Sequence, residues 1–411
     1  MQARGDVRAE IPREALLYPQ AHSLPLMTDP LEVHREALVI DTHADTPQRF
    51  VDERWEFTGP LGDGMINLKT ARQGNLAAEF FAIWVEPEEW RGRFVYRTLQ
   101  LIDGVYEQLR KHPQEMLLGL TPEDIVNAHS DGVFCVLMGL EGGHSIEADL
   151  GLLRLYHRLG IRYMTLTWAN SNEWADSSGD LDDPNVPHHG GLTAFGRDVI
   201  REMNRLGMMV DVSHVSDATF WDVLQTTHAP IFASHSCARA LTNSPRNLTD
   251  EQLRAVATNN GAVMVNFYPS FIDERFRVAW KATSAERDAL FDEAVAPFRE
   301  LKQPVPYALR MNIDRDFYTR CFNEAIALPP LDSLIDHFDY VAKVAGIDHV
   351  GIGSDFDGFS MLPTGMASAA DLPKITAALM QRGYTAEQMK KLLGGNLLRV
   401  FADVQAAAAK G

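Results

Sequence analysis

The stretch TAFGRDVIREMNRLGMMVDVSH, residues 193–214, predicts a helix followed directly by a strand. Its first part has apolar residues at three- and four-residue spacing, which indicates an amphipathic helix. These residues are Phe195, Val199, Met203 and Leu206. Thr193 is suited to cap the start of this helix, and Gly207 to end it. The run GMMVDVSH (207–214) is then almost wholly apolar until it ends in His214, as expected of a strand buried on both faces.

Seven more apolar runs of the same kind recur along the chain. They are ALVIDTHAD (37–45), AAEFFAIWV (77–85), GVFCVLMGLEGG (132–143), IRYMTLTW (161–168), PIFASHS (230–236), GAVMVNFY (261–268) and HVGIGSDFDG (349–358). Continuous apolar runs, in place of alternation, are typical of parallel sheets covered on both faces. Helical patterns lie between them, and one further apolar stripe is formed by Phe94, Leu99, Ile102, Tyr106 and Leu109.

About eight strands alternating with helices predict an α/β fold, a (β/α)₈ TIM barrel, whose reactive groups gather at the carboxyl ends of the strands. A doubly wound open sheet is the alternative. Residues 269–329 are too many for one crossover, so we expect a helical insertion before the last strand, with a helix at 284–301 over the barrel mouth. No linker divides the chain, which predicts an extension (1–35), one barrel domain (36–404) and an Ala-rich tail (405–411).

Composition restricts the partners. The 411 residues carry a formal net charge of −18, which argues against nucleic acid and anionic membranes because each phosphate contact requires Lys or Arg. Three widely spaced cysteines form no Cys-x-x-Cys pair, and this favours a reducing compartment. The amino-terminal segment is polar, and no run approaches the roughly 18 apolar residues of a membrane span. The sequence therefore predicts a cytoplasmic protein without a membrane anchor.

Side chains able to bind metals stand at the ends of several predicted strands. His43 and Asp45 follow the run LVID, and side chains at positions i and i+2 of an extended segment point the same way. Glu141 ends another run, where an unpaired buried carboxylate would cost several kcal/mol. His214 and His235 end two more. Each residue alone is better explained as a cap or a core residue, but in a barrel all five would converge on one mouth.

Three histidines, one aspartate and one glutamate are more than a single catalytic zinc commonly uses, which is three protein ligands and a water. The set suits two cations that share a carboxylate. Nitrogen and oxygen donors without thiolate favour Zn²⁺, with Mn²⁺ or Co²⁺ as substitutes. Asp355, which ends the last run, would remain available for proton transfer.

Arg246 lies in NSPRNLTDEQL (243–253), after the run that ends in His235 and before a helix that Thr249 can cap. A guanidinium at the barrel mouth can hold a substrate carboxylate through two parallel hydrogen bonds. An exposed loop arginine explains the spacing equally well.

At these residues the chain resembles the renal (membrane) dipeptidase family, zinc peptidase family M19 of the amidohydrolase-type barrels. The resemblance runs in order over residues 36–403. Its motifs are IDTHADTP (40–47), GLEGGHSIEADLGLLRLYHRLGIRYMTLT (139–167), GLTAFGRDVIREMNRLGMMVDVSHVS (191–216), ASHS (233–236), MVNFY (264–268), GIGSDFDG (351–358) and GGNLLRVF (394–401).

The resemblance implies a metal-dependent hydrolase barrel with two zinc ions per subunit. His43 and Asp45 match the pair that binds the first zinc. Glu141 matches the carboxylate that bridges both metals. His214 and His235 match the ligands of the second zinc.

It also implies residues on the substrate side. Asp355 matches the proton-transfer aspartate, and Arg246 matches the arginine that holds the terminal carboxylate of the dipeptide. Tyr268, at the end of MVNFY, is expected to line the substrate site. Trp168 is a departure, because it stands where the family has a histidine that contacts the substrate carbonyl. An indole N–H donates one hydrogen bond but carries no positive charge.

We therefore expect a binuclear zinc dipeptidase that cleaves dipeptides of two L-residues, and by resemblance also those with a C-terminal D-residue. A metal-bridging hydroxide would attack, and Asp355 would pass the proton to the departing amine. One alternative is an amidohydrolase of the same fold acting on N-acyl amino acids, since Trp168 reshapes the pocket. A non-catalytic metal-binding protein on the same barrel is another. The sequence is compatible with a homodimer but does not decide the oligomeric state.

Overall fold

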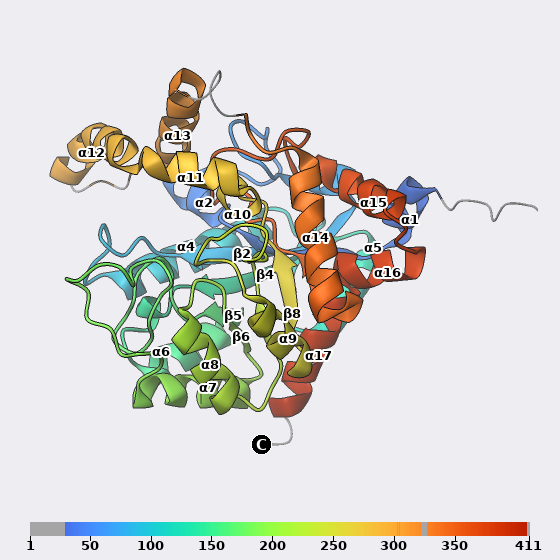
Figure 1. The fold of residues 1–411 in the computed structure, drawn as a ribbon, viewed down its shortest axis with the longest axis horizontal. Coiled ribbons are helices and arrows are strands. Elements are labelled where there is room, and N and C mark those ends of the chain that lie inside the picture. Colours follow the sequence, from blue (N-terminus) through green and yellow to red (C-terminus); the bar gives the residue numbers. More distant parts are fainter. Residues whose placement is uncertain (1–28, 302, 304, 322–326, 409–411) are drawn as a thin grey trace, which may run out of the picture.

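The computed structural model describes residues 29–301, 303, 305–321 and 327–408. Its strands form one parallel sheet (Figure 1). They are β1 (Val39–Ala44), β2 (Leu76–Trp84), β3 (Met116–Leu118), β4 (Phe134–Glu141), β5 (Ile161–Thr165), β6 (Met209–Asp211), β7 (Ile231–Ala233), β8 (Ala262–Val265) and β9 (Val350–Ile352). All eight predicted strands are confirmed.

Eight of these strands close into a barrel in the order β1-β2-β4-β5-β6-β7-β8-β9, and the pairing of Asp41 with Ile352 joins the two ends. This closure excludes the open-sheet alternative. The short strand β3 pairs only with the first residues of β4, from Phe134 to Val136. Strand β3 could not be predicted from the sequence, because three residues give no periodic signal.

Helices alternate with the strands around the barrel. They are α1 (Pro30–Glu36), α2 (Pro47–Asp52), α3 (Leu68–Gln73), α4 (Phe94–Lys111), α5 (Pro122–Asp131), α6 (Leu150–Arg158), α7 (Ala194–Leu206), α8 (Asp217–Thr226), α9 (Asp250–Thr258), α14 (Leu331–Ala345), α15 (Leu372–Gln381), α16 (Ala386–Lys390) and α17 (Asn396–Ala408). Short 3₁₀ turns lie at Gly143–Ile146, Ile347–His349 and Ala369–Asp371, and a π-turn at Lys391–Gly395. None of the helices described between residues 29 and 408 is both long and apolar enough to span a bilayer.

Helix α7 begins and ends where the sequence predicts. The side chain of Thr193 accepts a hydrogen bond from the amide of Gly196, and Gly207 ends the helix with a φ of 72°. That left-handed conformation is open to glycine at little cost.

Helix α4 faces the core differently from the prediction. Leu99 and Tyr106 are 44% and 37% exposed, so the predicted stripe is wrong at these two positions. The buried face instead carries Leu101, Val105 and the polar Arg97. Its guanidinium is accommodated because it donates to Asp52 at 2.6 Å, and a buried charge that is paired breaks the apolar pattern on which the prediction relied.

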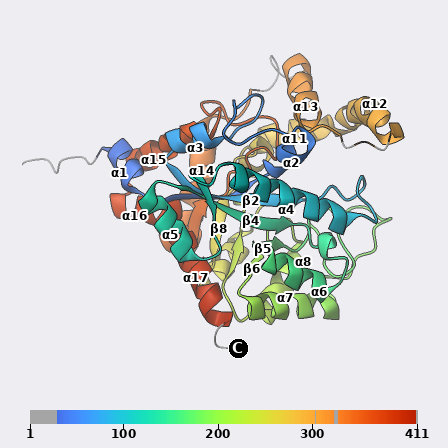
Figure 2. The ribbon, with the colours of Figure 1, turned by 180° about the vertical axis from the view of Figure 1, so that it is seen from behind.

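A helical excursion occupies the place of a simple crossover between β8 and β9. It contains α10 (Pro269–Ile272), α11 (Glu274–Ala282), α12 (Ser284–Leu301) and α13 (Tyr307–Cys321). Helix α12 coincides with the helix predicted at 284–301. Both views show α12 and α13 standing out from the barrel (Figures 1 and 2). The predicted division into extension, barrel and tail stays a prediction: residues 1–28 and 409–411 lie outside the described part, and α17 runs on to Ala408.

Aromatic side chains fill the barrel interior beneath the strand ends. Tyr163 of β5 lies between Phe80 of β2 and Phe232 of β7, with ring centroids 5.5 and 5.3 Å away. Gly139 on β4 makes this possible, because a Cβ there would come within 1.9 Å of the Tyr163 ring. The hydroxyl of Tyr163 thus reaches upward to the carboxyl ends of the strands, where it contacts His43.

Candidate metal centre and active site

Four residues from three strand ends surround the carboxylate of Glu141, the last residue of β4. Its Oε1 lies 2.9 Å from His214 Nε2 and 3.4 Å from His235 Nε2. Its other oxygen, Oε2, lies 3.4 Å from His43 Nε2, which in turn is 3.6 Å from Asp45 Oδ2. The five predicted metal-binding side chains therefore converge on one point, and the two oxygens of Glu141 face different histidines.

Two groups of donor atoms in this cluster could hold a metal ion. His43, Glu141 and His235 form one, and His43, Asp45 and Asp355 form the other, with donor atoms within 4.8 Å of each other in each group. His43 Nε2 and Asp45 Oδ1 are buried without a hydrogen-bond partner. Buried polar atoms without a partner are costly, so this donor set fits a bound cation.

A glycine keeps open the space beside the two aspartates. A Cβ at Gly358 would lie 2.0 Å from Asp355 Oδ1 and 2.5 Å from Asp45 Oδ2. Asp355 and His214 also adopt left-handed backbone conformations, with φ of 64° and 68°. Such conformations cost non-glycine residues on the order of 1 kcal/mol and cluster at functional sites.

Burial sets the protonation of the cluster. It lowers the pKa of His214 to about 4, and the pKa of His235 falls well below its ordinary value for the same reason. Both imidazoles are therefore neutral near pH 7 and offer a lone pair. Burial also raises the pKa of Asp355 well above its usual range, while Asn266 Nδ2 donates to Asp355 Oδ2 at 2.9 Å.

A tyrosine orients the first histidine. The Tyr163 hydroxyl donates to the carbonyl of Thr42 at 3.1 Å, so it accepts the hydrogen bond from His43 Nδ1 at 2.8 Å. This assigns a proton of the imidazole to Nδ1 and leaves Nε2 as the ring atom that faces Glu141. Hydrogen bonds of this kind commonly fix the tautomer of metal-binding histidines.

A serine and an aspartate orient a second histidine, His235. Ser234 Oγ donates to Asp211 Oδ2 at 2.6 Å and lies 2.7 Å from His235 Nδ1. Since the serine hydrogen is used toward Asp211, Nδ1 of His235 is the donor and its Nε2 is free to bind a cation. Neither Tyr163 nor Asp211 was predicted as a site residue, because both lie within apolar strands and show no motif of their own.

A cavity of about 300 Å³ opens above this cluster. Arg246 lines it and is 8% exposed, so the exposed-loop interpretation is wrong. Its Nη2 donates to the carbonyl of His235 at 3.2 Å, its Nη1 donates to Ser236 Oγ at 3.4 Å, and its Cζ lies 5.2 Å from the centre of the Phe271 ring. Its Nε has no partner within the described chain.

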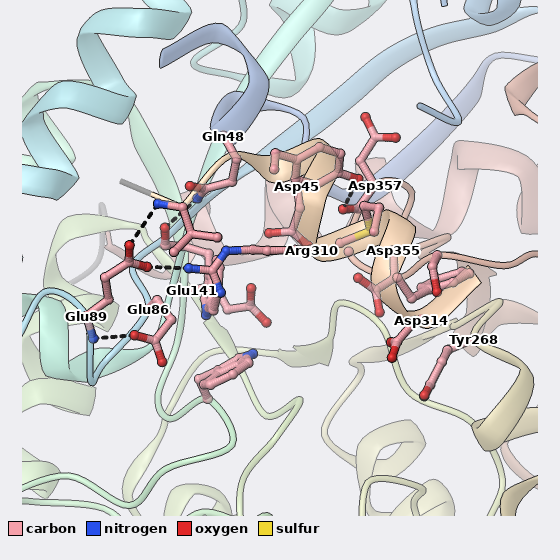
Figure 3. A pocket seen from close by; sticks show the side chains of 18 of the residues that line it. Asp45, Gln48, Glu86, Glu89, Glu141, Tyr268, Arg310, Asp314, Asp355 and Asp357 are labelled. Carbon is pink, nitrogen blue, oxygen red and sulfur yellow. Dashed lines mark hydrogen bonds and ion pairs between the residues drawn. The ribbon is translucent and has the colours of Figure 1, made fainter. Parts of the chain in front are cut away.

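The other two predicted substrate residues line the same cavity. The Trp168 ring lies 6.4 Å from that of His214 and 4.9 Å from that of Trp84. Tyr268 packs against Phe271, 4.9 Å away. Figure 3 shows Tyr268 at one end of the cavity beside Asp314 and Asp355.

Several residues that line the cavity were not predicted from the sequence. Trp84 carried a usable signal, since it lies at the end of the run 77–85 just as the metal-binding residues end theirs. Arg310, from α13, pairs with Glu89 at the other end of the cavity (Figure 3). It carried no signal, because its position depends on how the excursion folds back.

Comparisons with known proteins identify the family of the chain. The family model for membrane dipeptidase (peptidase family M19) matches residues 28–411. The dipeptidase AclJ of Aspergillus oryzae is 33% identical over 84% of this chain and 71% of its own length. The structure of the probable dipeptidase PvdM from Pseudomonas aeruginosa is 28% identical, with a TM-score of 0.77 over 93% of this chain and 98% of that one.

A second solved structure is that of a metallopeptidase from Rhodobacter sphaeroides bound to a phosphinate mimic of the dipeptide L-Ala-D-Ala. It is 27% identical, with a TM-score of 0.70 over 90% of this chain and 99% of that chain. The solved relatives share the barrel fold of this chain. The chain belongs to the membrane dipeptidase family, peptidase family M19, and is a metallo-dipeptidase.

Proposed function

We propose that this metallo-dipeptidase works with two zinc ions bridged by Glu141. The observation that carries the proposal is the placement of the two carboxylate oxygens, one facing His43 and the other facing His214 and His235. His43 and Asp45 would hold the first ion, and the other two histidines the second. Imidazole and carboxylate donors suit Zn²⁺, and Mn²⁺ or Co²⁺ could replace it.

When bound, two such ions polarise the scissile carbonyl and lower the pKa of a water molecule. Residues of the chain would accept and transfer the proton. Asp355 lies beside Asp45 in the cavity wall, and burial raises its pKa, which suits a carboxyl that takes up a proton and releases it to the departing amine. Asn266 keeps this carboxyl in place through its hydrogen bond to Oδ2.

Arg246 would bind the free carboxylate of the substrate. It is a buried cation whose Nε is unpaired, and a substrate carboxylate can form a charge-assisted hydrogen bond with it. A longer peptide would carry its carboxylate away and leave the guanidinium unpaired, which explains selection for dipeptides. The mimic bound to the Rhodobacter relative has a D-residue at the second position, so we propose that dipeptides with a C-terminal D-residue are also accepted.

The test combines metal analysis with a substrate panel. Purified enzyme should bind about two zinc ions per chain and hydrolyse L,L- and L,D-dipeptides, and a chelator should abolish both properties. N-acyl amino acids should be poor substrates, because they lack the free amine of a dipeptide. Preferential cleavage of N-acyl amino acids would favour the amidohydrolase alternative, and two bound metals without any hydrolysis would favour a binding protein. The homodimer and the cytoplasmic location stay predictions.

A further inference from the structure

We propose that the enzyme prefers dipeptides whose amino-terminal residue has a large aromatic or aliphatic side chain, which packs against Trp84 and Trp168. The inference rests on the proposed function, because it takes Arg246 as the site of the substrate carboxylate.

The two indoles flank the central carboxylate. Trp84 is the last residue of β2 and is paired in register with Glu141, the last residue of β4. Trp168 follows β5, the neighbour of β4 on its other side. Their ring centroids are 4.9 Å apart with an interplanar angle of 55°, so together they form one aromatic surface across the end of β4.

Trp84 lies on the side of the barrel away from Arg246. In the ring of eight strands, β2, which ends in Trp84, is four places from β7, which precedes Arg246, and β5, which precedes Trp168, is two places from β7. A dipeptide with its carboxylate at Arg246 and its scissile carbonyl over Glu141 therefore extends its amino-terminal residue toward Trp84, and the Trp168 ring lies beside that of Trp84.

Four charged residues at this end of the cavity are paired with one another. Arg97 donates to Asp52 at 2.6 Å, and Arg310 pairs with Glu89 (Figure 3). Glu86, which also lines this end, accepts a hydrogen bond from the backbone amide of Glu89. An anionic substrate side chain would lie near these carboxylates or would have to displace one of them, at a cost in free energy. A neutral apolar side chain would instead cover aromatic surface and displace water from it.

The cavity has room for such a side chain. Its volume of about 300 Å³ falls at the lower end of pockets that enclose drug-sized ligands, roughly 300–1,000 Å³. A dipeptide of two small residues would leave the tryptophans uncovered. Burying a large apolar side chain in place of a methyl group should raise kcat/KM about 10- to 100-fold.

Four dipeptides test the inference on the zinc-loaded wild-type enzyme. Phe-Gly and Ala-Gly vary the amino-terminal side chain, and Gly-Phe and Gly-Ala vary the carboxyl-terminal one. We expect Phe-Gly to exceed Ala-Gly by about 10-fold or more in kcat/KM, and the Gly-Phe to Gly-Ala ratio to be smaller. Equal rates for Phe-Gly and Ala-Gly, or a preference confined to the carboxyl-terminal pair, would overturn it. Failure to cleave any dipeptide would overturn the proposed function as well, which separates the two results.

A substitution tests whether Trp168 produces the preference for a large amino-terminal side chain. Trp168→Ala should lower the Phe-Gly to Ala-Gly ratio at least several-fold while zinc content is retained, because it removes half of the aromatic surface. Trp221→Ala is the matched control, since Trp221 is 38% exposed on α8 and is absent from the cavity wall. An unchanged ratio in Trp168→Ala would contradict the assignment. The wild-type comparison decides the preference itself even if that variant folds poorly.

Discussion

The floor of the active-site cavity and its upper wall are built in different ways. The floor consists of strand ends: His43, Glu141 and His235 are at most 3% exposed, and Tyr163 and Ser234 hold the two histidines in place. The upper wall comes from α13, outside the barrel, and is attached by contacts between side chains and loops. One is the Arg310–Glu89 pair, whose side chains are 20% and 17% exposed.

This difference separates the chemistry from one part of substrate binding. Residues on the strand ends are fixed by the sheet, so they can place several side chains accurately, and Trp84 and Trp168 belong to this fixed part. Residues on a helical excursion can change without disturbing the barrel, and they adjust the shape of the cavity. Substitutions of the proposed metal ligands in the floor should therefore abolish the reaction, whereas substitutions in α13 should change how tightly substrates bind.

The sharpest test of the floor is Glu141→Gln. The neutral amide cannot bridge two cations, so we expect metal content to fall and kcat/KM to drop by roughly 10³-fold or more. Elemental analysis and dipeptide kinetics measure the two effects. Glu293→Gln, at an exposed position of α12, is the control and should behave as wild type. A variant that keeps both metals and most of its activity would contradict the bridging role.

Arg246→Ala removes the proposed carboxylate contact and should lower kcat/KM by about 10²-fold. A substrate-side control is available, because a dipeptide amide has no terminal carboxylate. The amide should be a poor substrate for the wild type, and the variant should cleave it about as fast as the wild type does. If the variant also loses about 10²-fold in kcat/KM for the amide, Arg246 stabilises the structure of the site and does not bind the substrate carboxylate.

Tyr163→Phe tests the support beneath the floor. The ring still fills the space over Gly139, but the hydrogen bond to His43 is lost. Zinc affinity should therefore fall about 10- to 100-fold, as is typical when a partner of a metal ligand is removed. Competition with a chelator measures the affinity, and thermal unfolding of the metal-free protein reports packing. Unchanged affinity would show that the hydroxyl has no role in orienting His43.

The smallest effect is expected in the upper wall. Arg310→Ala removes the pair with Glu89 but touches no proposed metal ligand. Zinc content should stay at the wild-type value, and KM should rise by roughly 3- to 10-fold, since a partly exposed ion pair contributes about 1 kcal/mol. Glu89→Gln should have a similar effect, and the double variant should add little to either. Loss of zinc in Arg310→Ala would show that the upper wall also supports metal binding, which contradicts the separate roles of floor and wall.

The same contrast explains what could be predicted from sequence. The strands could be predicted because they are apolar and buried on both faces, and each proposed metal-binding residue stands at the end of such a run. The buried face of α4 could not be predicted, because it carries Arg97, whose hydrogen-bond partner, Asp52, lies elsewhere in the chain. The contribution of Arg310 depends on how a long excursion packs, and local sequence patterns do not encode such distant contacts.

A crystal structure of the zinc-loaded enzyme, with anomalous data collected at the zinc edge, would locate the metal ions relative to Glu141. We expect two peaks about 3.5–4 Å apart on either side of the Glu141 carboxylate, one beside His43 and Asp45 and the other beside His214 and His235. A single peak, or two peaks that do not share Glu141, would show that this carboxylate does not bridge two cations.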